Sequence, residues 1–139
     1  FLNSLKPLLK PHHNKALILG TGGASKAIAY ALEKLNIEFK FVSRRLGDNN
    51  FLYSVLNQQI IEEYTVIINC TPIGTYPNVD DAPAIPYQYI SDKHLLFDLI
   101  YNPAESKFLL EGKSKGAITK NGYEMLELQA EKSWEIWNL

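Results

Sequence analysis

The sequence contains a single cysteine, Cys70, among its 139 residues, so the chain cannot form an internal disulfide. One thiol fits a reducing compartment such as the cytoplasm and excludes a cysteine-rich metal site. The formal net charge is −1 and no long basic or acidic run occurs, which argues against a dedicated nucleic-acid or membrane-surface protein. No apolar run approaches the roughly 18 residues that span a bilayer, and no signal peptide is recognisable. We therefore expect a cytoplasmic protein with no metal site and with neither nucleic acid nor membrane as a partner.

The composition is that of one packed domain. Hydrophobic residues make up 46% of the chain, which is enough for a core, and 139 residues is the size of one ordinary domain. We therefore expect residues 1–139 to form a single domain. The chain begins at Phe1 inside an apolar pattern of helical spacing, FLNSLKPLLK, and we expect it to be a piece of a longer protein.

Short apolar runs alternate with amphipathic patterns along the whole chain. Runs of strand type cover residues 15–20, 38–43, 64–71, 94–101 and 117–120. Helices are expected over residues 2–10, 23–35 and 49–58, from Pro103 to Gly112, and over residues 122–137. The segment PIGTYPNVDDAPAIP is rich in proline, glycine and aspartate and is expected to be a loop. This alternation predicts an α/β fold, a Rossmann-like doubly wound and mostly parallel sheet with helices on both faces.

Three glycines stand at the turn from the first strand into the first long helix, in the run GTGGAS. Gly20 suits the tight turn that leaves the strand, and Gly22 suits the close approach of a phosphate to the backbone, where a Cβ would clash. Ser25 replaces the usual third glycine with another small residue. The rest of the predicted loop consists of Thr21, Gly23 and Ala24. Because the helix that follows has unpaired N–H groups and a positive dipole end, the pattern predicts a pyrophosphate site. The alternative is a glycine turn that only joins two elements.

Two arginines follow the second strand. Proteins that bind NAD usually have an aspartate or glutamate there, which holds the 2′-hydroxyl of the ribose. This chain has Ser43, Arg44 and Arg45 instead. A guanidinium can hold a 2′-phosphate with two charge-assisted hydrogen bonds of roughly 1.5–3 kcal/mol each, whereas a carboxylate would repel it. The pattern therefore favours NADP over NAD, by on the order of a hundredfold or more. The alternative is that both arginines are solvated on a surface turn.

Four stretches together resemble one family. They are GTGGASKA (20–27), NCTPIGTYP (69–77), DLIYNP (98–103) and NGYEMLELQA (121–130). In this order they are similar to the C-terminal, cofactor-binding domain of the shikimate dehydrogenases, and the resemblance covers nearly the whole chain. It implies the cofactor-binding part of an NADP-dependent oxidoreductase. Enzymes of this family interconvert 3-dehydroshikimate and shikimate by reversible hydride transfer, in the biosynthesis of chorismate and the aromatic amino acids.

The resemblance also implies roles for individual residues. In the family the glycine loop binds pyrophosphate, and an Asn-Arg-Thr motif, which reads Ser43-Arg44-Arg45 here, binds the 2′-phosphate. Residues matched to the rest of the cofactor site are Thr71, Pro72, Ile73, Leu99, Gly122 and Met125. Residues matched to contacts with the substrate are Tyr101 and Gln129. From the residues alone, Thr71 and Tyr101 each follow a predicted strand, so we expect them to face one crevice at the carboxyl edge of the sheet.

The chain departs from the family pattern in ways that bear on these expectations. Ser43 and Arg45 replace the neighbours of the family arginine, and Asp48 stands where a further arginine is usual, so we expect a rearranged 2′-phosphate site. The catalytic lysine and aspartate of the family belong to its N-terminal substrate domain and match no residue of this chain. We therefore expect the chain to bind NADP, to contact that domain through its last helix, and to be inactive by itself. The alternatives are a quinate/shikimate dehydrogenase relative and a standalone NADPH-binding regulatory module.

Overall fold

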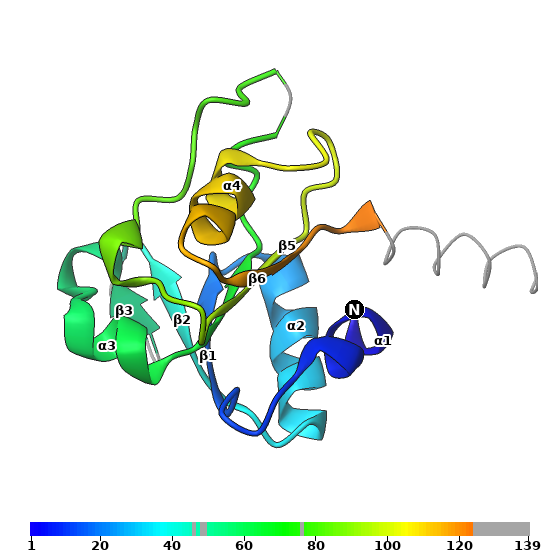
Figure 1. The fold of residues 1–139 in the computed structure, drawn as a ribbon. Helices are drawn as coiled ribbons and strands as arrows, with labels where there is room; N and C mark the ends of the chain where they lie inside the picture. The colour runs from blue at the N-terminus through cyan, green and yellow to red at the C-terminus, as the bar shows by residue number, and fades with distance from the viewer. Residues whose placement is uncertain (46, 48–49, 76, 124–139) are drawn as a thin grey trace, which may run out of the picture.

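The computed structural model describes residues 1–45, 47, 50–75 and 77–123. Six strands form one sheet in the order β3-β2-β1-β4-β5-β6, and every neighbouring pair is parallel (Figure 1). The strands are β1 (Lys15–Leu19), β2 (Glu38–Ser43), β3 (Asn50–Leu52), β4 (Val66–Asn69), β5 (Leu95–Asp98) and β6 (Ile118–Lys120). The order runs outward in opposite directions from β1 and β4, which confirms the predicted Rossmann-like α/β fold.

Helices cover both faces of the sheet. They are α1 (Leu2–Leu5), α2 (Gly23–Lys34), α3 (Gln58–Glu63) and α4 (Lys107–Ser114), with 3₁₀ turns η1 (Lys6–Leu8), η2 (Tyr53–Val55) and η3 (Tyr87–Tyr89). Successive strand residues point to opposite faces, so the core is split in two. Ile67 and its neighbours pack with α3 and α4 on one face, while Ile68 and its neighbours pack with α1 and α2 on the other. Both faces of the central strands are therefore buried, as their continuous apolar runs indicate.

The prediction of a helix over residues 49–58 was wrong. Residues 50–52 form β3 at the edge of the sheet and residues 53–55 form η2. Only residues 44–49 connect β2 to β3. This short connection is long enough because β3 begins at Asn50, which pairs with Phe41 near the end of β2. Asparagine side chains bond readily to nearby backbone, which competes with a helix, and Asn50 does so here. The helix starts later, after Asn57, whose Oδ1 accepts from the backbone N–H of Ile60 at 2.9 Å.

Two other helices differ from expectation at their ends. The helix expected to start at Pro103 starts at Lys107, because Ser106 is its N-cap residue and accepts from the backbone N–H of Leu109. The helix expected over residues 2–10 is an α-helical turn that continues as the 3₁₀ turn η1, which contains Pro7. The helix expected over residues 122–137 lies outside the described residues.

Histidines join the segments that enter the strands at the amino edge of the sheet. The Nε2 atoms of His12 and His13, which precede β1, each hydrogen-bond to the carbonyl of Lys93, which precedes β5, at 3.0 Å. The Thr65 hydroxyl, just before β4, donates to the carbonyl of His12 at 3.0 Å. The ring of His94 bonds to the carbonyl of Ile61 at 2.7 Å. The amino edge is thus held together by polar contacts between segments far apart in the sequence.

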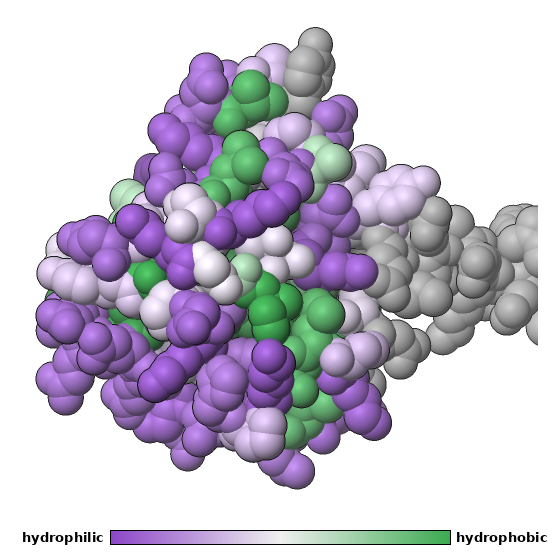
Figure 2. All heavy atoms as spheres, viewed as in Figure 1, coloured by the Kyte–Doolittle hydropathy of each residue, from purple (hydrophilic) through white to green (hydrophobic). Residues whose placement is uncertain are grey.

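Hydrophilic residues cover most of the face seen in Figure 2, while hydrophobic ones gather mainly over the region of α1 and α2. Exposed aromatic side chains include Tyr30, Tyr101 and Tyr123. Within the described part of the chain, no helix combines the length and the apolar character needed to cross a membrane.

Candidate functional site

The carboxyl ends of the parallel strands meet at one edge of the sheet, where cavities open, and two of them contain the residues that the sequence singled out. We name the first the arginine cavity. It has a volume of about 420 Å³ and is lined by Gly20, Thr21, Val42, Ser43, Arg44, Arg45, Tyr53, Thr71, Pro72 and Ile73. The second, the tyrosine cavity, has a volume of about 480 Å³ and is lined by Ala24, Cys70, Thr71, Pro72, Thr75, Leu99, Ile100, Tyr101 and Asn102. Thr71 and Pro72 line both, so the turn after β4 is the wall between them. Thr71 and Tyr101 face one crevice, as the sequence predicts.

The glycine turn lies between β1 and α2. Gly20 has φ +110°, and a Cβ there would lie 3.2 Å from Cγ2 of Thr71, so both the backbone and the space require glycine. At Gly22 and Gly23, by contrast, a Cβ would meet no protein atom within 4 Å. Ser25 is fully buried, and its hydroxyl donates to the carbonyl of Gly22 at 2.6 Å. The turn therefore leaves open backbone at the start of α2, where the protein's own packing does not require glycine.

The two arginines lie on a turn whose backbone is held by side-chain hydrogen bonds. The Ser43 hydroxyl donates to the carbonyl of Arg45 at 2.6 Å, and the Asn50 amide donates to that carbonyl at 2.8 Å and to the Ser43 hydroxyl at 2.9 Å. Both guanidiniums are exposed, and among the described residues no ion pair involves either of them. Burial raises the pKa of the Tyr53 phenol, and the charge of Arg44 opposes this shift. The arginine cavity thus has two cations available for an anion.

A buried carboxylate lies beneath the tyrosine cavity. Asp98, the last residue of β5, is fully buried and accepts hydrogen bonds from the backbone N–H of Ile100 at 3.0 Å, from the Ser106 hydroxyl and from the Asn69 amide at 3.2 Å. Burial raises its pKa to about 6, although the three hydrogen bonds act in the opposite direction. The carboxylate therefore connects the segment after β5 with the start of α4.

Asn69, the last residue of β4, continues this network towards the wall between the cavities. Its Nδ2 donates to Asp98, and its Oδ1 accepts from the Thr71 hydroxyl at 2.6 Å and from the Thr71 backbone N–H at 3.0 Å. The same hydroxyl accepts from the backbone N–H of Ile73 at 3.3 Å. Asn69 is fully buried, so it acts on the site through Thr71.

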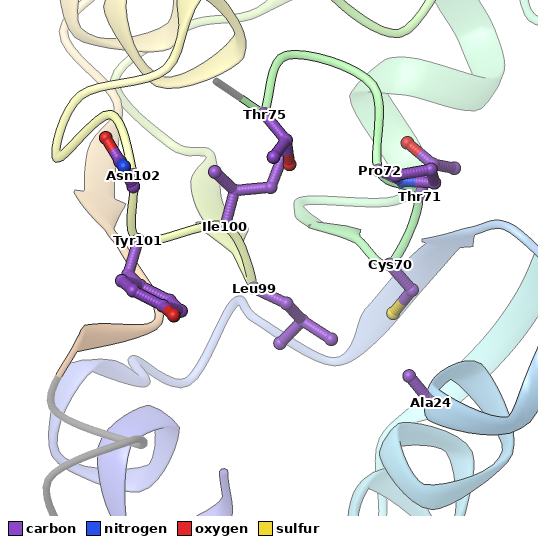
Figure 3. Close-up of a pocket in the computed structure, with 9 residues that line it drawn as sticks. All are labelled: Ala24, Cys70, Thr71, Pro72, Thr75, Leu99, Ile100, Tyr101 and Asn102. Carbon is purple, nitrogen blue, oxygen red and sulfur yellow. The ribbon is translucent and has the colours of Figure 1, made fainter. Parts of the chain in front are cut away.

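Apolar side chains line the floor of the tyrosine cavity. Figure 3 shows Leu99 and Cys70 pointing into the same space, with Ala24 of α2 below them. Burial raises the pKa of the Cys70 thiol to about 12, and the nearby charge of Asp98 contributes to this shift. Gly122 is buried against the backbone of Leu99, where a Cβ would lie only 2.2 Å from the Leu99 carbonyl oxygen. Tyr101 is 49% exposed at the rim, so its phenol can reach a ligand.

The structure brings together all the described residues that the sequence singled out, apart from Gly22 and Gly23, which lie at the start of α2, and Gly122, which lies behind Leu99. Met125 and Gln129 lie outside the described residues, as does Asp48. Sequence reasoning missed the lining residues Val42, Tyr53, Cys70, Thr75, Ile100 and Asn102, and also Asn50, Asn69 and Asp98, which support the lining from behind. Asn69 and Asp98 could have been noticed, since each is a polar residue at the end of an apolar strand run.

The residues present fit a phosphorylated dinucleotide. Open backbone at Gly22 and Gly23, at the start of a helix of 12 residues, provides N–H donors for a pyrophosphate. The cations of Arg44 and Arg45 line the same cavity as Gly20 and suit a further phosphate. A carboxylate that would favour a ribose 2′-hydroxyl is absent from the described lining of that cavity.

Comparison with known proteins gives a consistent result in sequence and in fold. No family model matches the chain. The shikimate dehydrogenase (NADP(+)) of Methanococcus maripaludis is 43% identical over 135 residues, which cover 87% of this chain and 48% of that protein. The crystal structure of shikimate dehydrogenase from Aquifex aeolicus matches 99% of this chain and 53% of that one, with a TM-score of 0.81 and 31% identity.

A third match extends the comparison to a structure with bound ligands. Shikimate 5-dehydrogenase from Thermus thermophilus, solved in complex with NADP(H) and shikimate, matches 99% of this chain and 54% of that one, with a TM-score of 0.73 and 27% identity. The chain spans about half the length of the curated relatives it matches. By sequence and by fold, the chain is therefore homologous to the shikimate dehydrogenases over about half of their length.

Proposed function

We propose that this chain binds NADP at the carboxyl edge of its sheet and is the cofactor-binding part of an NADP-dependent shikimate dehydrogenase. The observation that carries the proposal is the shared lining of the arginine cavity, in which Gly20 and Thr21 meet Arg44 and Arg45. The glycine turn that would lead to the pyrophosphate and the arginines that would bind a further phosphate thus border one cavity of about 420 Å³. That combination suits NADP and not a mononucleotide or an unphosphorylated sugar.

The start of α2, the two arginines and the turn after β4 would divide the binding between them. The start of α2 at Gly22–Ala24 would hold the pyrophosphate through backbone N–H groups and the helix dipole. Arg44 and Arg45 would hold the 2′-phosphate with charge-assisted hydrogen bonds. The turn from Thr71 to Ile73 would form the wall along which the cofactor passes into the tyrosine cavity. Its nicotinamide would then lie beside Leu99, and Gly122 and Met125 are proposed to contribute to its binding.

We propose the substrate side of the reaction from the names of the relatives, and the tyrosine cavity and the greater length of those relatives support it. When bound, NADPH supplies the hydride that reduces the ketone of 3-dehydroshikimate to shikimate, in the route to chorismate and the aromatic amino acids. Tyr101 and Gln129 would hold the hydroxyl or carboxylate groups of the substrate. The alcohol needs a proton carrier, which we assign to a lysine and aspartate pair of a preceding substrate domain. Residues 1–139 would then form the NADP-binding domain, which would contact that other domain.

Titration of this chain with NADP and with NAD tests the cofactor proposal directly. We expect NADP to bind more tightly, and we expect Arg44→Asp to weaken NADP binding by about tenfold or more while NAD loses little, because only NADP has the 2′-phosphate. Lys115→Asp, which makes the same charge change at an exposed position just after α4, serves as the control. No association with either dinucleotide by calorimetry, or equal losses for both in the Arg44→Asp variant, would contradict the proposal.

Turnover separates the chain from the longer protein that we propose it belongs to. This chain alone should form no NADPH from shikimate, because it supplies the cofactor site and one wall of the substrate site only. The longer protein should turn over shikimate faster than quinate. Steady-state rates with both substrates distinguish a shikimate dehydrogenase from a quinate/shikimate relative, and NADP binding with no turnover in the longer protein would favour a regulatory module.

A further inference from the structure

The turn from Thr71 to Ile73 forms the wall shared by the two cavities, and its conformation is set from within the core. We propose that Asn69 is a positioning residue for dinucleotide binding: its amide holds this turn in place, and the Asp98 carboxylate fixes which way the amide faces. The inference rests on the proposed function, since it concerns the cofactor that these cavities would bind. Neither side chain can touch a ligand, because both are fully buried.

The direction of the hydrogen bonds carries the argument. An asparagine amide has a donor end and an acceptor end of nearly the same shape, so only its partners decide its orientation. An ionised carboxylate can only accept, and Asp98 therefore takes the Nδ2 end at 3.2 Å. The Oδ1 end is then left facing the backbone N–H of Thr71 at 3.0 Å and its hydroxyl at 2.6 Å. If the amide were reversed, two donors would face each other at Thr71.

The effect continues one step further along the turn. Because the Thr71 hydroxyl donates to Asn69, its lone pairs are free to accept from the backbone N–H of Ile73 at 3.3 Å. The Asn69 Nδ2 also lies 3.5 Å from the Ile73 carbonyl oxygen. Ile73 lines the arginine cavity and Thr71 lines both cavities. The chain of contacts from Asp98 thus ends on the surface where the cofactor would lie.

The Asp98 carboxylate also stabilises the side of the tyrosine cavity that is formed by the segment after β5. Asp98 accepts from the backbone N–H of Ile100, which lines the tyrosine cavity, and from the hydroxyl of Ser106, the N-cap residue of α4. The other titratable groups near this carboxylate are the Cys70 thiol, after β4, and the Tyr87 phenol of η3. Burial raises the pKa of both, so both stay neutral between pH 6 and pH 9. Among the described residues, a change in binding relative to wild type over that range can therefore be assigned to the carboxylates of the network.

Asn69→Asp is the sharpest test because it keeps the shape of the side chain and replaces the donor end with an acceptor. At about pH 9 two carboxylates would face each other at the distance of the present hydrogen bond, and the turn should lose its support. At about pH 6 a shared proton can bridge the two carboxyl groups and restore a hydrogen bond where the amide donated. Asn57→Asp is the matched control, since aspartate is as good an N-cap as asparagine there.

Calorimetric titration with NADP and with NAD, for the wild-type chain and both variants at the two pH values, decides the matter. Relative to wild type, Asn69→Asp should bind both dinucleotides about tenfold more weakly at about pH 9 and within about threefold at about pH 6, as expected for one lost and regained charge-assisted hydrogen bond. Asn57→Asp should match wild type at both pH values. If Asn69→Asp does not fold at the higher pH, recovery of circular dichroism and of binding at the lower pH would support the proposal equally.

Three results would overturn the inference. They are unchanged affinity of Asn69→Asp at the higher pH, a loss of the same size at both pH values, and a loss confined to NADP, which would point to the 2′-phosphate and not to the shared wall. None of these results contradicts the proposed function as long as the wild-type chain binds NADP. Absence of binding by the wild-type chain would instead overturn the proposed function and this inference together.

Discussion

Replacing Gly22 with alanine is expected to weaken dinucleotide binding while leaving the fold as stable as before. Gly22 is the N-cap residue of α2, with φ −74° and ψ −173°, a conformation open to any residue. A Cβ there meets no protein atom within 4 Å. Alanine is a poorer N-cap than glycine by about 0.5 kcal/mol, and the loss of unfolded-state freedom stabilises by about 0.4–1 kcal/mol. These effects nearly cancel, so the free energy of unfolding should change by no more than about 0.5 kcal/mol.

The binding loss comes from the space that the new methyl group fills. Phosphate oxygens that bond to backbone N–H groups lie about 2.9 Å from the nitrogen, which leaves no room for a Cβ on the same side of the turn. Losing one charge-assisted hydrogen bond of roughly 1.5–3 kcal/mol weakens binding by about tenfold to a hundredfold. Unlike Arg44→Asp, the Gly22→Ala variant should lose NADP and NAD by similar factors, because both contain the pyrophosphate.

Calorimetry and urea unfolding together test this prediction, with Gly20→Ala as the contrasting variant. Gly20 has φ +110°, and its added Cβ would lie 3.2 Å from Cγ2 of Thr71. Gly20→Ala should therefore lower the free energy of unfolding by about 1–2 kcal/mol or more, because a side chain is strained in that conformation. A Gly22→Ala chain that is as stable as wild type and binds NADP equally well would refute the assignment of this turn to the pyrophosphate.

Two further predictions concern Asp98 and Cys70, whose pKa values are raised in the folded chain. Asp98 has a pKa of about 6 in the folded chain, against an ordinary value of 3.8. Between these two values the folded state keeps a proton that the unfolded state releases. The free energy of unfolding should therefore fall by about 3 kcal/mol as the pH rises from about 4 to about 7. Urea unfolding of wild type and Asp98→Asn across this range should show the fall only in wild type, and parallel curves would contradict the buried carboxylate. Because the pKa of Cys70 is raised to about 12, its thiol should react with iodoacetamide at about pH 8 far more slowly than a free cysteine does. Rapid labelling of the folded chain would contradict the raised pKa.

The parts of this molecule that repeat a simple pattern could be predicted from the sequence. Continuous apolar runs such as KALIL and VIIN become central strands because both of their faces are covered. The tight turn at Gly20 could be predicted because few other residues take a positive φ. The place of the arginines at the carboxyl edge could be predicted because they directly follow β2. Each of these signals is local, so no tertiary information is needed.

The parts that could not be predicted depend on contacts between distant segments. The edge strand β3 has only three residues and is held by the Asn50 amide, which pairs with a turn whose position the sequence does not specify. The link between Asn69 and Asp98 joins residues 29 positions apart, and it exists because β4 and β5 are neighbours in the sheet. Either residue alone could be noticed as a polar residue in an apolar run, but their pairing follows only from the strand order.

The histidine contacts at the amino edge have a practical consequence for handling this protein. β1 has five residues, so at about 3.3 Å per residue the two edges of the sheet lie about 16 Å apart. The side chain of Lys93 is exposed on the amino edge, whereas the cavities open on the other. A dye attached to Lys93 would therefore label the chain, and a resin linker attached there would immobilise it, without blocking entry of a nucleotide.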